Sequence, residues 1–183
     1  ATEQTEPLAV DSYNKIIVRN GGQDRDHTFL LWNVLSPLAK ESGLIHVADA
    51  IPAIVYLNGE YYSYMCLQQH INRDYLGNLH GLNKELIVDN QFGSERELLA
   101  ATGLNQLLQE DIQDPAIREQ VEKIVDIDDL FLYYAFEMVA NNLDWLHNNY
   151  RGWRYTGQAV EGNAFSDGRM CSLCRLLSTM VIT

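Results

Sequence analysis

The chain has 183 residues, of which 46% are hydrophobic and 21% are charged, a balance that is typical of folded globular proteins and excludes wholesale disorder. Its net charge of -12 creates a surface field that repels nucleic-acid backbones and anionic lipid headgroups, so nucleic-acid binding is not expected. No apolar run approaches the roughly 20 residues that a membrane-spanning helix needs. The segment 1–7 is polar and acidic, unlike a secretion signal, although a signal removed before Ala1 stays open because no initiator Met is present.

The cysteines and histidines do not predict a metal site. Three cysteines make an odd count, which does not suggest a disulfide framework. Cys171 and Cys174 form a single CxxC pair, whereas a structural zinc ion needs four ligands. Four of the histidines share no ligand spacing on one helix: His27, His46, His70 and His80.

The first third of the chain predicts a strand, a helix and a hairpin. Residues 1–12 have no periodicity and are expected to be a linker or a frayed terminus. Residues 13–19 form a β-branched strand, which Asn20-Gly21-Gly22 ends in a turn. A helix is predicted over 26–42, with a kink or break near Ser36 because Pro37 removes one helical hydrogen bond. Its apolar stripe consists of Leu30, Val34 and Leu38.

A hairpin is the clearest local prediction. Two apolar and tyrosine-rich runs, 50–57 and 60–67, flank Asn58-Gly59, the strongest short-range hairpin signal. Asn72 is then predicted to cap a helix that continues to about residue 79, and 85–89 to form a short strand. Ser94-x-x-Glu97 is a capping box that starts a helix, which Gly103 ends.

The second half of the chain is predominantly helical in this prediction. Asp114-Pro115 starts one helix, whose buried face contains Val121 and Val125 together with Ile117 and Ile124. The longest helix, 127–139, is expected to run through the middle of a helical lobe. Its predicted buried stripe comprises Ile127, Leu130, Phe131, Tyr134, Ala135, Met138 and Val139. A strand is predicted over 150–155, so the fold class is α+β, with strands early and helices late.

The polar loop 141–149 joins the longest helix to that strand. Asp144 and Asn149 within it have the Asp-x-x-x-x-Asn spacing of a kinase catalytic loop, in which the Asp accepts a hydroxyl proton and the Asn ligates magnesium. A polar turn whose Asn side chains bond the local backbone gives the same pattern, so both interpretations stay open. His147 is either an acid or base near neutral pH or a structural histidine, and Trp145 is interpreted as a packing anchor.

Four stretches, taken in order, resemble the CotH family of atypical protein kinases, which is known from bacterial spore coats. They are Ile17-Val18-Arg19-Asn20-Gly21-Gly22, Val55-Tyr56-Leu57-Asn58-Gly59-Glu60-Tyr61-Tyr62, Ile71-Asn72-Arg73-Asp74-Tyr75-Leu76, and Asn142-Leu143-Asp144-Trp145 with Asn148-Asn149-Tyr150. The resemblance extends over residues 13–155 and implies an incomplete kinase-like fold. In it, 13–70 corresponds to the N-terminal lobe and 71–169 to a helical lobe.

The resemblance also implies roles for four residues. Asp144 is similar to the catalytic Asp, Asn149 to the magnesium-ligating Asn, and Arg19 to a basic residue that contacts nucleotide phosphates. A surface or sheet-edge arginine is the alternative for Arg19. Gln69 stands beside the expected nucleotide base, where related sequences carry an acidic residue. The implied cofactors are ATP and magnesium, the implied partner is a protein with an acceptor Ser or Thr, and the implied location is the spore coat or another cell surface.

The end of the chain departs from the family pattern. A kinase site needs a second acidic metal ligand after the strand that follows the catalytic loop, but no aspartate follows Asp167. Asp167-Gly168 resembles the turn before that strand, so 170–183 is the anomalous part. Two explanations are open: a frameshift near Arg169 or Met170, and a natural short chain whose tail forms its own apolar element. Three functional classes follow, namely an impaired kinase, an inactive kinase-like binding module and an unrelated α+β scaffold.

Overall fold

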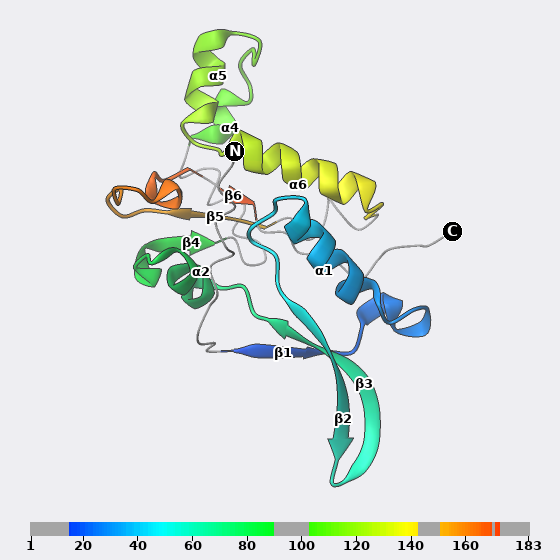
Figure 1. Cartoon of the computed structure of the whole chain (residues 1–183). Coiled ribbons are helices and arrows are strands. Elements are labelled where there is room, and N and C mark those ends of the chain that lie inside the picture. The colour runs from blue at the N-terminus through cyan, green and yellow to red at the C-terminus, as the bar shows by residue number, and fades with distance from the viewer. Residues whose placement is uncertain (1–14, 90–102, 143–150, 170, 173–183) are drawn as a thin grey trace, which may run out of the picture.

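The computed structural model describes residues 15–89, 103–142, 151–169 and 171–172, and within them the fold is α+β, as predicted (Figure 1). The strands are β1 (Ile16–Arg19), β2 (Ala50–Leu57), β3 (Glu60–Gln69), β4 (Ile87–Asp89), β5 (Gly152–Tyr155) and β6 (Cys171–Ser172). The α-helices are α1 (Leu31–Glu41), α2 (Arg73–His80), α4 (Leu104–Leu107), α5 (Pro115–Glu122) and α6 (Ile127–Val139). Three 3₁₀ turns are η1 (Gly22–Asp26), η2 (Lys84–Leu86) and η3 (Ala164–Ser166).

The first sheet has the order β1-β3-β2, and both of its strand pairs are antiparallel. The predicted hairpin is confirmed: β2 and β3 are joined by Asn58 (φ 53°) and Gly59 (φ 87°), the two left-handed residues of a tight hairpin turn. The end of this hairpin projects away from the helices (Figure 1). β3 therefore forms the centre of the sheet, between the strand that opens the described chain and the strand that precedes the turn.

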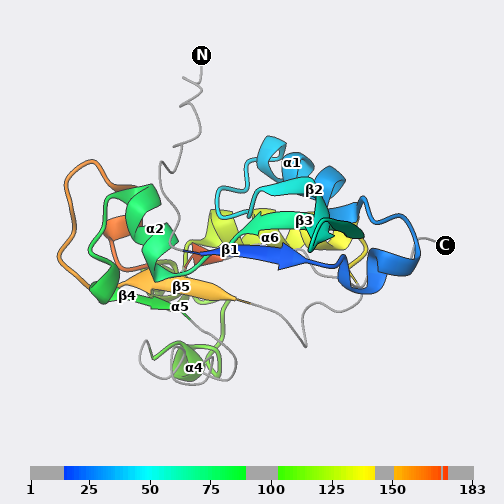
Figure 2. The ribbon, with the colours of Figure 1, turned by 90° about the horizontal axis from the view of Figure 1, so that it is seen from below.

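Helix α1 lies over one face of the first sheet (Figure 2). Its start is fixed by Asp24, whose buried carboxylate accepts hydrogen bonds from the backbone N–H of Leu31 (2.9 Å) and of Thr28 (3.1 Å). Burial opposes ionisation of Asp24, but these bonds outweigh it and lower its pKa. The helix consequently begins at Leu31, later than the predicted start at Asp26, where the 3₁₀ turn η1 ends.

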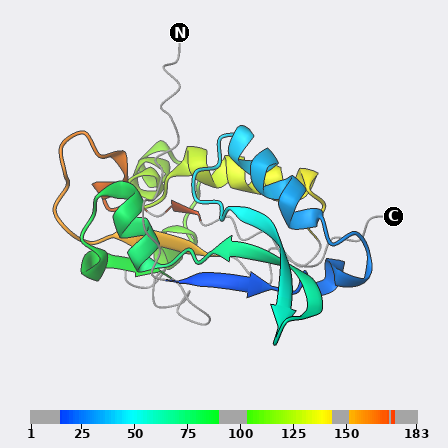
Figure 3. The same ribbon diagram turned by 60° about the horizontal axis from the view of Figure 1, so that its bottom comes forward.

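The second sheet has the antiparallel order β4-β5-β6, and α2 lies beside it in Figure 3. The Asn72 side chain accepts the backbone N–H of Tyr75 at 2.9 Å, which confirms the predicted helix cap. β6 follows Asp167-Gly168 and lies at the start of the tail that the sequence analysis treats as anomalous. The buried apolar residues of this region are Tyr75, Leu76, Leu79, Leu82, Ile87, Trp153 and Tyr155.

Helices α4 and α5 lie together at one end of α6 (Figure 1). The start of α5 is as predicted, because the Asp114 carboxylate accepts the Ala116 N–H at 2.8 Å and Pro115 occupies the first turn. Val121 and Val125 are buried there with Leu104. The short helix α4 was not predicted, and the capping box at 94–97 lies outside the described residues.

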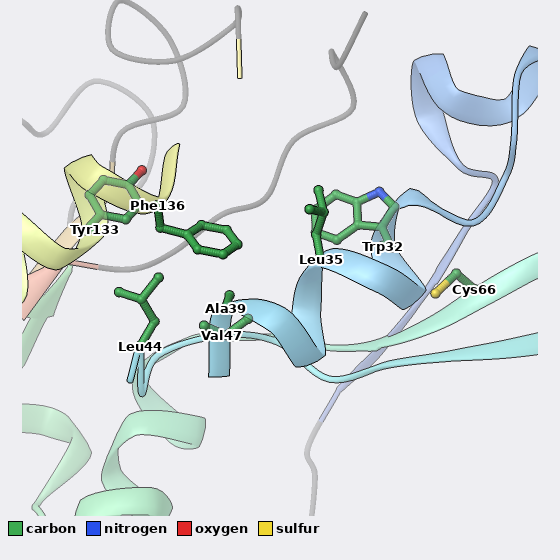
Figure 4. Packing of buried hydrophobic residues seen from close by; sticks show 8 residues of the cluster. All are labelled: Trp32, Leu35, Ala39, Leu44, Val47, Cys66, Tyr133 and Phe136. Carbon is green, nitrogen blue, oxygen red and sulfur yellow. The ribbon is translucent and has the colours of Figure 1, made fainter. Parts of the chain in front are cut away.

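The predicted bounds of α6 are confirmed, but its predicted buried face is right only in part, since Ile127, Leu130 and Tyr134 are partly buried and the other four residues are exposed. Phe131, Met138 and Val139 are 67%, 71% and 84% exposed, whereas Tyr133 and Phe136 are buried. The helix carries apolar residues on more than one of its faces, so the periodicity of these residues does not decide which face is buried. Packing decides it instead: Phe136 extends from α6 toward the buried side chains of α1 (Figure 4).

In helix α1 the side that was predicted to be buried is exposed. Its predicted stripe of Leu30, Val34 and Leu38 is exposed, and the core side is formed by Trp32, Leu35 and Ala39. Of the predicted kink or break near Ser36, the break is wrong, because Pro37 lies inside a continuous helix. Pro37 is exposed, so its ring projects into solvent and the helix loses one backbone hydrogen bond without ending.

No helix within the described ranges is both long enough and apolar enough to cross a membrane.

The two phenylalanines of α6 provide a direct test of which face is buried. Phe136→Ala removes a ring that is 7% exposed and should lower the free energy of unfolding by about 3–5 kcal/mol. The matched Phe131→Ala removes a ring that is 67% exposed and should change it by less than about 0.5 kcal/mol. Urea unfolding of the two variants decides the question, and a larger loss for Phe131→Ala would show that the sequence-predicted face is the correct one.

Candidate functional site

The described residues contain two of the four sequence-predicted site residues. Arg19 and Gln69 are described, whereas Asp144 and Asn149, together with Trp145 and His147, lie outside the described residues. The structure nevertheless describes the residues on both sides of the loop. The chain is described after α6 up to Asn142, and again from Arg151.

Arg19 ends β1 on the face of the sheet that α1 covers. Its partner across the strand pair is Cys66 of β3, and its guanidinium carbon lies 4.9 Å from the centre of the Trp32 ring on α1. This cation–π geometry holds the side chain over the helix, and the guanidinium remains charged at any accessible pH. The end of β1 therefore carries a half-buried positive charge between the sheet and α1.

Polar and aromatic groups continue along the same face beyond Arg19. The Asn33 amide donates a hydrogen bond to the Tyr64 hydroxyl at 3.2 Å, and the ring of Phe29 meets the Tyr64 ring edge-on at 4.9 Å. The Cys66 thiol lies 3.7 Å from the Asn33 amide oxygen. Burial raises the pKa of Cys66 despite the opposing charge of Arg19, so the thiol stays protonated and is not a nucleophile at neutral pH.

Gln69, the last residue of β3, is held by Asp49. Its amide N–H donates to the Asp49 carboxylate at 2.7 Å, and its amide oxygen accepts the Asp49 backbone N–H at 3.1 Å. The carboxylate also pairs with Lys40 of α1. Asp49 therefore bonds both the nitrogen and the oxygen of the Gln69 side-chain amide. Sequence reasoning missed this contact because Asp49 lies 20 positions away and belongs to no motif.

The strand register does not bring Arg19 and Gln69 together. Arg19 pairs with Cys66, whereas Gln69 pairs with Ile16 at the opposite end of β1. Because side chains alternate along a strand, Arg19 and Cys66 share one face of the sheet and Gln69 belongs to the other. The two predicted nucleotide contacts thus leave the sheet in opposite directions.

A buried glutamate anchors the start of the polar loop. The Glu137 carboxyl, 1% exposed as a residue, accepts the side-chain amide of Asn142 at 2.7 Å, and the Glu137 carbonyl accepts the Asn142 backbone N–H at 3.1 Å. Between them Asn141 adopts the left-handed conformation (φ 51°) that ends the helix. Burial raises the pKa of Glu137, although hydrogen bonds from Asn142 and Tyr133 oppose the shift.

An ion pair anchors the residue at which the described chain resumes. The guanidinium of Arg151 lies 3.1 Å from the carboxylate of Asp89 at the end of β4, and Arg73 approaches the same carboxylate to 3.6 Å. The Asp89 side chain is 4% exposed and that of Arg151 14%, so removal of either charge would leave the other buried. Both flanks of the loop are therefore fixed, one to α6 and one to β4.

Neither anchor was predicted from the sequence. Glu137 stands alone within an apolar run and would be expected on a solvent-facing side, and Asp89 and Arg151 are 62 positions apart. Among the described residues, no three or more His, Cys, Asp or Glu side chains are grouped so that they could hold a metal ion.

Comparisons with protein-family models, with curated proteins and with solved structures find no match for this chain. Inference about function therefore depends on the residues of the chain and their geometry.

Glu137 gives a prediction with a defined sign. An acid whose pKa is raised by folding stabilises the protein least at high pH, because the unfolded chain then releases a proton that the folded chain retains. Relative to the wild type, Glu137→Gln should therefore become more stable as the pH rises above about 4.5 toward the raised pKa of the folded chain, since Gln still accepts the Asn142 amide and does not titrate.

Urea unfolding at several pH values measures this difference. A suitable control is Glu119→Gln, which removes an exposed carboxylate whose pKa is lowered by Lys123, so its difference from wild type should stay nearly constant above about pH 4.5 and is weakened by solvent. A difference between Glu137→Gln and wild type that does not change with pH would contradict a pKa of Glu137 that burial raises.

Proposed function

We propose that the chain is part of a kinase-like domain of the CotH type, whose ancestral reaction is transfer of the ATP γ-phosphoryl group to a Ser or Thr of a protein. We further propose that this reaction is impaired in the chain. The observation that carries the proposal is Arg19, a charged side chain held at the end of β1 between the sheet and the first helix.

The order of the elements supports this proposal. In protein kinases a cation on one strand contacts the phosphates and is held by the helix that follows. Here β1 ends in Arg19, α1 follows and covers the sheet, and a hairpin then contributes the central and outer strands. Arg19 differs from the kinase cation in its partner, because it lies over the Trp32 ring where kinases use a glutamate.

The proposed roles follow from the chemistry of the side chains. Arg19 would donate hydrogen bonds to phosphate oxygens, for which its planar guanidinium is well suited. Asp144 would orient the acceptor hydroxyl and take its proton. Asn149 would supply one oxygen ligand to magnesium, an ion that, when bound, neutralises charge on the ATP phosphates. The two anchors, Glu137 with Asn142 and Asp89 with Arg151, would hold the ends of the loop that carries Asp144 and Asn149.

The available side chains fit magnesium ATP only in part. The proposed set offers one arginine, one aspartate and one asparagine, and the described residues contain no acidic cluster that would complete a magnesium shell. A kinase site needs a second acidic ligand to hold the metal against the phosphates. We therefore derive no phosphoryl-transfer step for this chain.

An inactive kinase-like binding module is the second candidate, and Gln69 favours it. Both ends of the Gln69 amide are bonded to Asp49, and the side chain leaves the sheet on the face opposite to Arg19. The Gln69 side chain thus joins the end of β3 to the residue that precedes β2. Under this alternative the domain would recognise a protein or peptide at a spore or cell surface, without nucleotide.

Nucleotide binding separates the two candidates. If the proposal is correct, the chain binds ATP, and Arg19→Gln weakens binding by about 10- to 100-fold because a charge-assisted phosphate contact is lost. The matched control Arg118→Gln removes an exposed arginine on α5 and should leave the dissociation constant unchanged. Calorimetry with and without magnesium gives both constants, and no binding under either condition would favour the binding module.

A transfer assay tests the proposed impairment separately. The purified chain, incubated with magnesium ATP and a Ser-rich peptide, is expected to show little or no phosphorylation of itself or the peptide. Phosphorylation that is abolished by Asp144→Asn would contradict the impairment and establish the chain as an active kinase.

A further inference from the structure

Two buried histidines, far apart in the sequence, meet within the fold. The Nε2 atoms of His46 and His80 lie 2.9 Å apart, and the two residues are 1% and 7% exposed. His46 belongs to the connection between α1 and β2, and His80 is the last residue of α2. The 34 positions that separate them explain why no ligand spacing or helical pattern predicted the contact.

Aromatic rings enclose this histidine pair. The His80 ring stacks on Trp153 of β5 with an interplanar angle of 16° and lies 4.1 Å from the ring of Phe165 in η3, measured between centroids. His46 meets the same two rings edge-on, at 5.2 Å and 5.4 Å. The pair therefore lies in a largely apolar enclosure, in which a positive charge on either imidazole loses most of its hydration.

The hydrogen bond between the rings limits their protonation. One Nε2 must donate a proton and the other must accept it, so the two nitrogens cannot both carry a proton at a separation of 2.9 Å. Burial acts in the same direction and lowers the pKa of His80 from its ordinary value of 6.5 to about 4. The closed contact consequently requires that the accepting Nε2 stay unprotonated, and the apolar enclosure disfavours a charge on either imidazole, whereas the exposed histidines of an unfolded chain would take up protons.

Two acidic residues that lie near the histidines in the sequence are paired with lysines. At the start of α2, Asp74 pairs with Lys84 of η2, and Asp49, close to His46 in sequence, pairs with Lys40. On β5, Arg154 alternates with Trp153 and Tyr155, which are buried, and so leaves the opposite face of the strand. Among the rings that the structure describes in contact with the pair, the two histidines themselves are the titratable members.

The histidine pair also joins two separate parts of the hydrophobic core. His46 precedes Val47, which packs with Leu44 and the α1 side chains, whereas His80 lies among the rings that pack around α2 and β5. The His80 carbonyl accepts the side-chain amide of Asn163 at 2.6 Å, which ties the segment before η3 to the same point. Opening of the pair would thus loosen α2, β5 and η3 from the connection that leads into β2.

We propose that the His46–His80 contact is an acid-sensitive latch, closed while both imidazoles are neutral and opened by protonation, that fastens α2 and the second sheet to the rest of the chain. The proposal does not depend on nucleotide binding or on any catalytic role of the chain. Its stabilising contribution is fully present above the pKa of an unfolded histidine, and it is lost as the pH falls through that value toward the pKa of the folded chain.

The variant His80→Gln tests the latch, because Gln retains a hydrogen-bonding partner for His46 but does not titrate. Between about pH 6.5 and 4.5, the folding equilibrium constant of the wild type should fall roughly 30-fold more than that of the variant. His27→Gln, which removes an exposed histidine, should behave like the wild type. Equal pH dependence of wild type and His80→Gln would overturn the proposal.

Hydrogen exchange distinguishes a latch from general acid unfolding. As the pH falls, and after correction for intrinsic exchange, the amides of Leu76–His80 in α2 should lose protection before those of Tyr133–Glu137 in α6. Simultaneous loss in both helices would overturn the latch. If His80→Gln does not fold, NMR titration of the wild-type imidazoles still decides: His80 titrating at its ordinary value would refute the proposal, and titration at about 4 would support it.

Discussion

The packing of α1 and α6 side chains beside β3 is the interaction on which the rest of the described fold depends (Figure 4). Trp32 is central to it, since one surface of its ring is buried with Leu35 and Cys66 while Arg19 lies over the ring. Phe136 and Tyr133 enter the same cluster from α6. This cluster therefore fixes both the direction of the β1 arginine and the rotation of the helix that leads to the polar loop.

The rotation of α6 has a further consequence at its C-terminal end. With Tyr133 and Phe136 turned inward, Glu137 is also turned inward, and the carboxyl becomes an internal acceptor for Asn142. Burial raises the pKa of this acid, and the hydrogen bond from Asn142 offsets part of the cost of burying the carboxyl. At the other side of the loop a charged pair, Asp89 with Arg151, has the same function by a different chemistry. Anchoring of both flanks is a property that a functional loop requires, and it holds whether the loop serves catalysis or recognition.

Local signals predicted much of the fold, and the reason is visible in particular residues. Asn58-Gly59, Asn72 and Asp114 each act on backbone groups within a few positions, so their effects do not depend on the remainder of the chain. The buried faces of α1 and α6 depend on which partners they meet, and there periodicity selected the wrong side of α1 and only part of the buried side of α6. The contacts of Gln69 with Asp49 and of His46 with His80 join distant positions that share no motif. Such pairs arise only when the chain has folded.

The central proposal is that the chain binds ATP and that Arg19 and the polar loop 141–149 contribute contacts to it. Photo-crosslinking with an azido analogue of ATP, followed by peptide mapping, tests it most directly. The account predicts that the label attaches to peptides containing residues 19–33 and 141–150, and that excess ATP prevents labelling. Labelling confined to other peptides, or labelling that ATP does not displace, would contradict it.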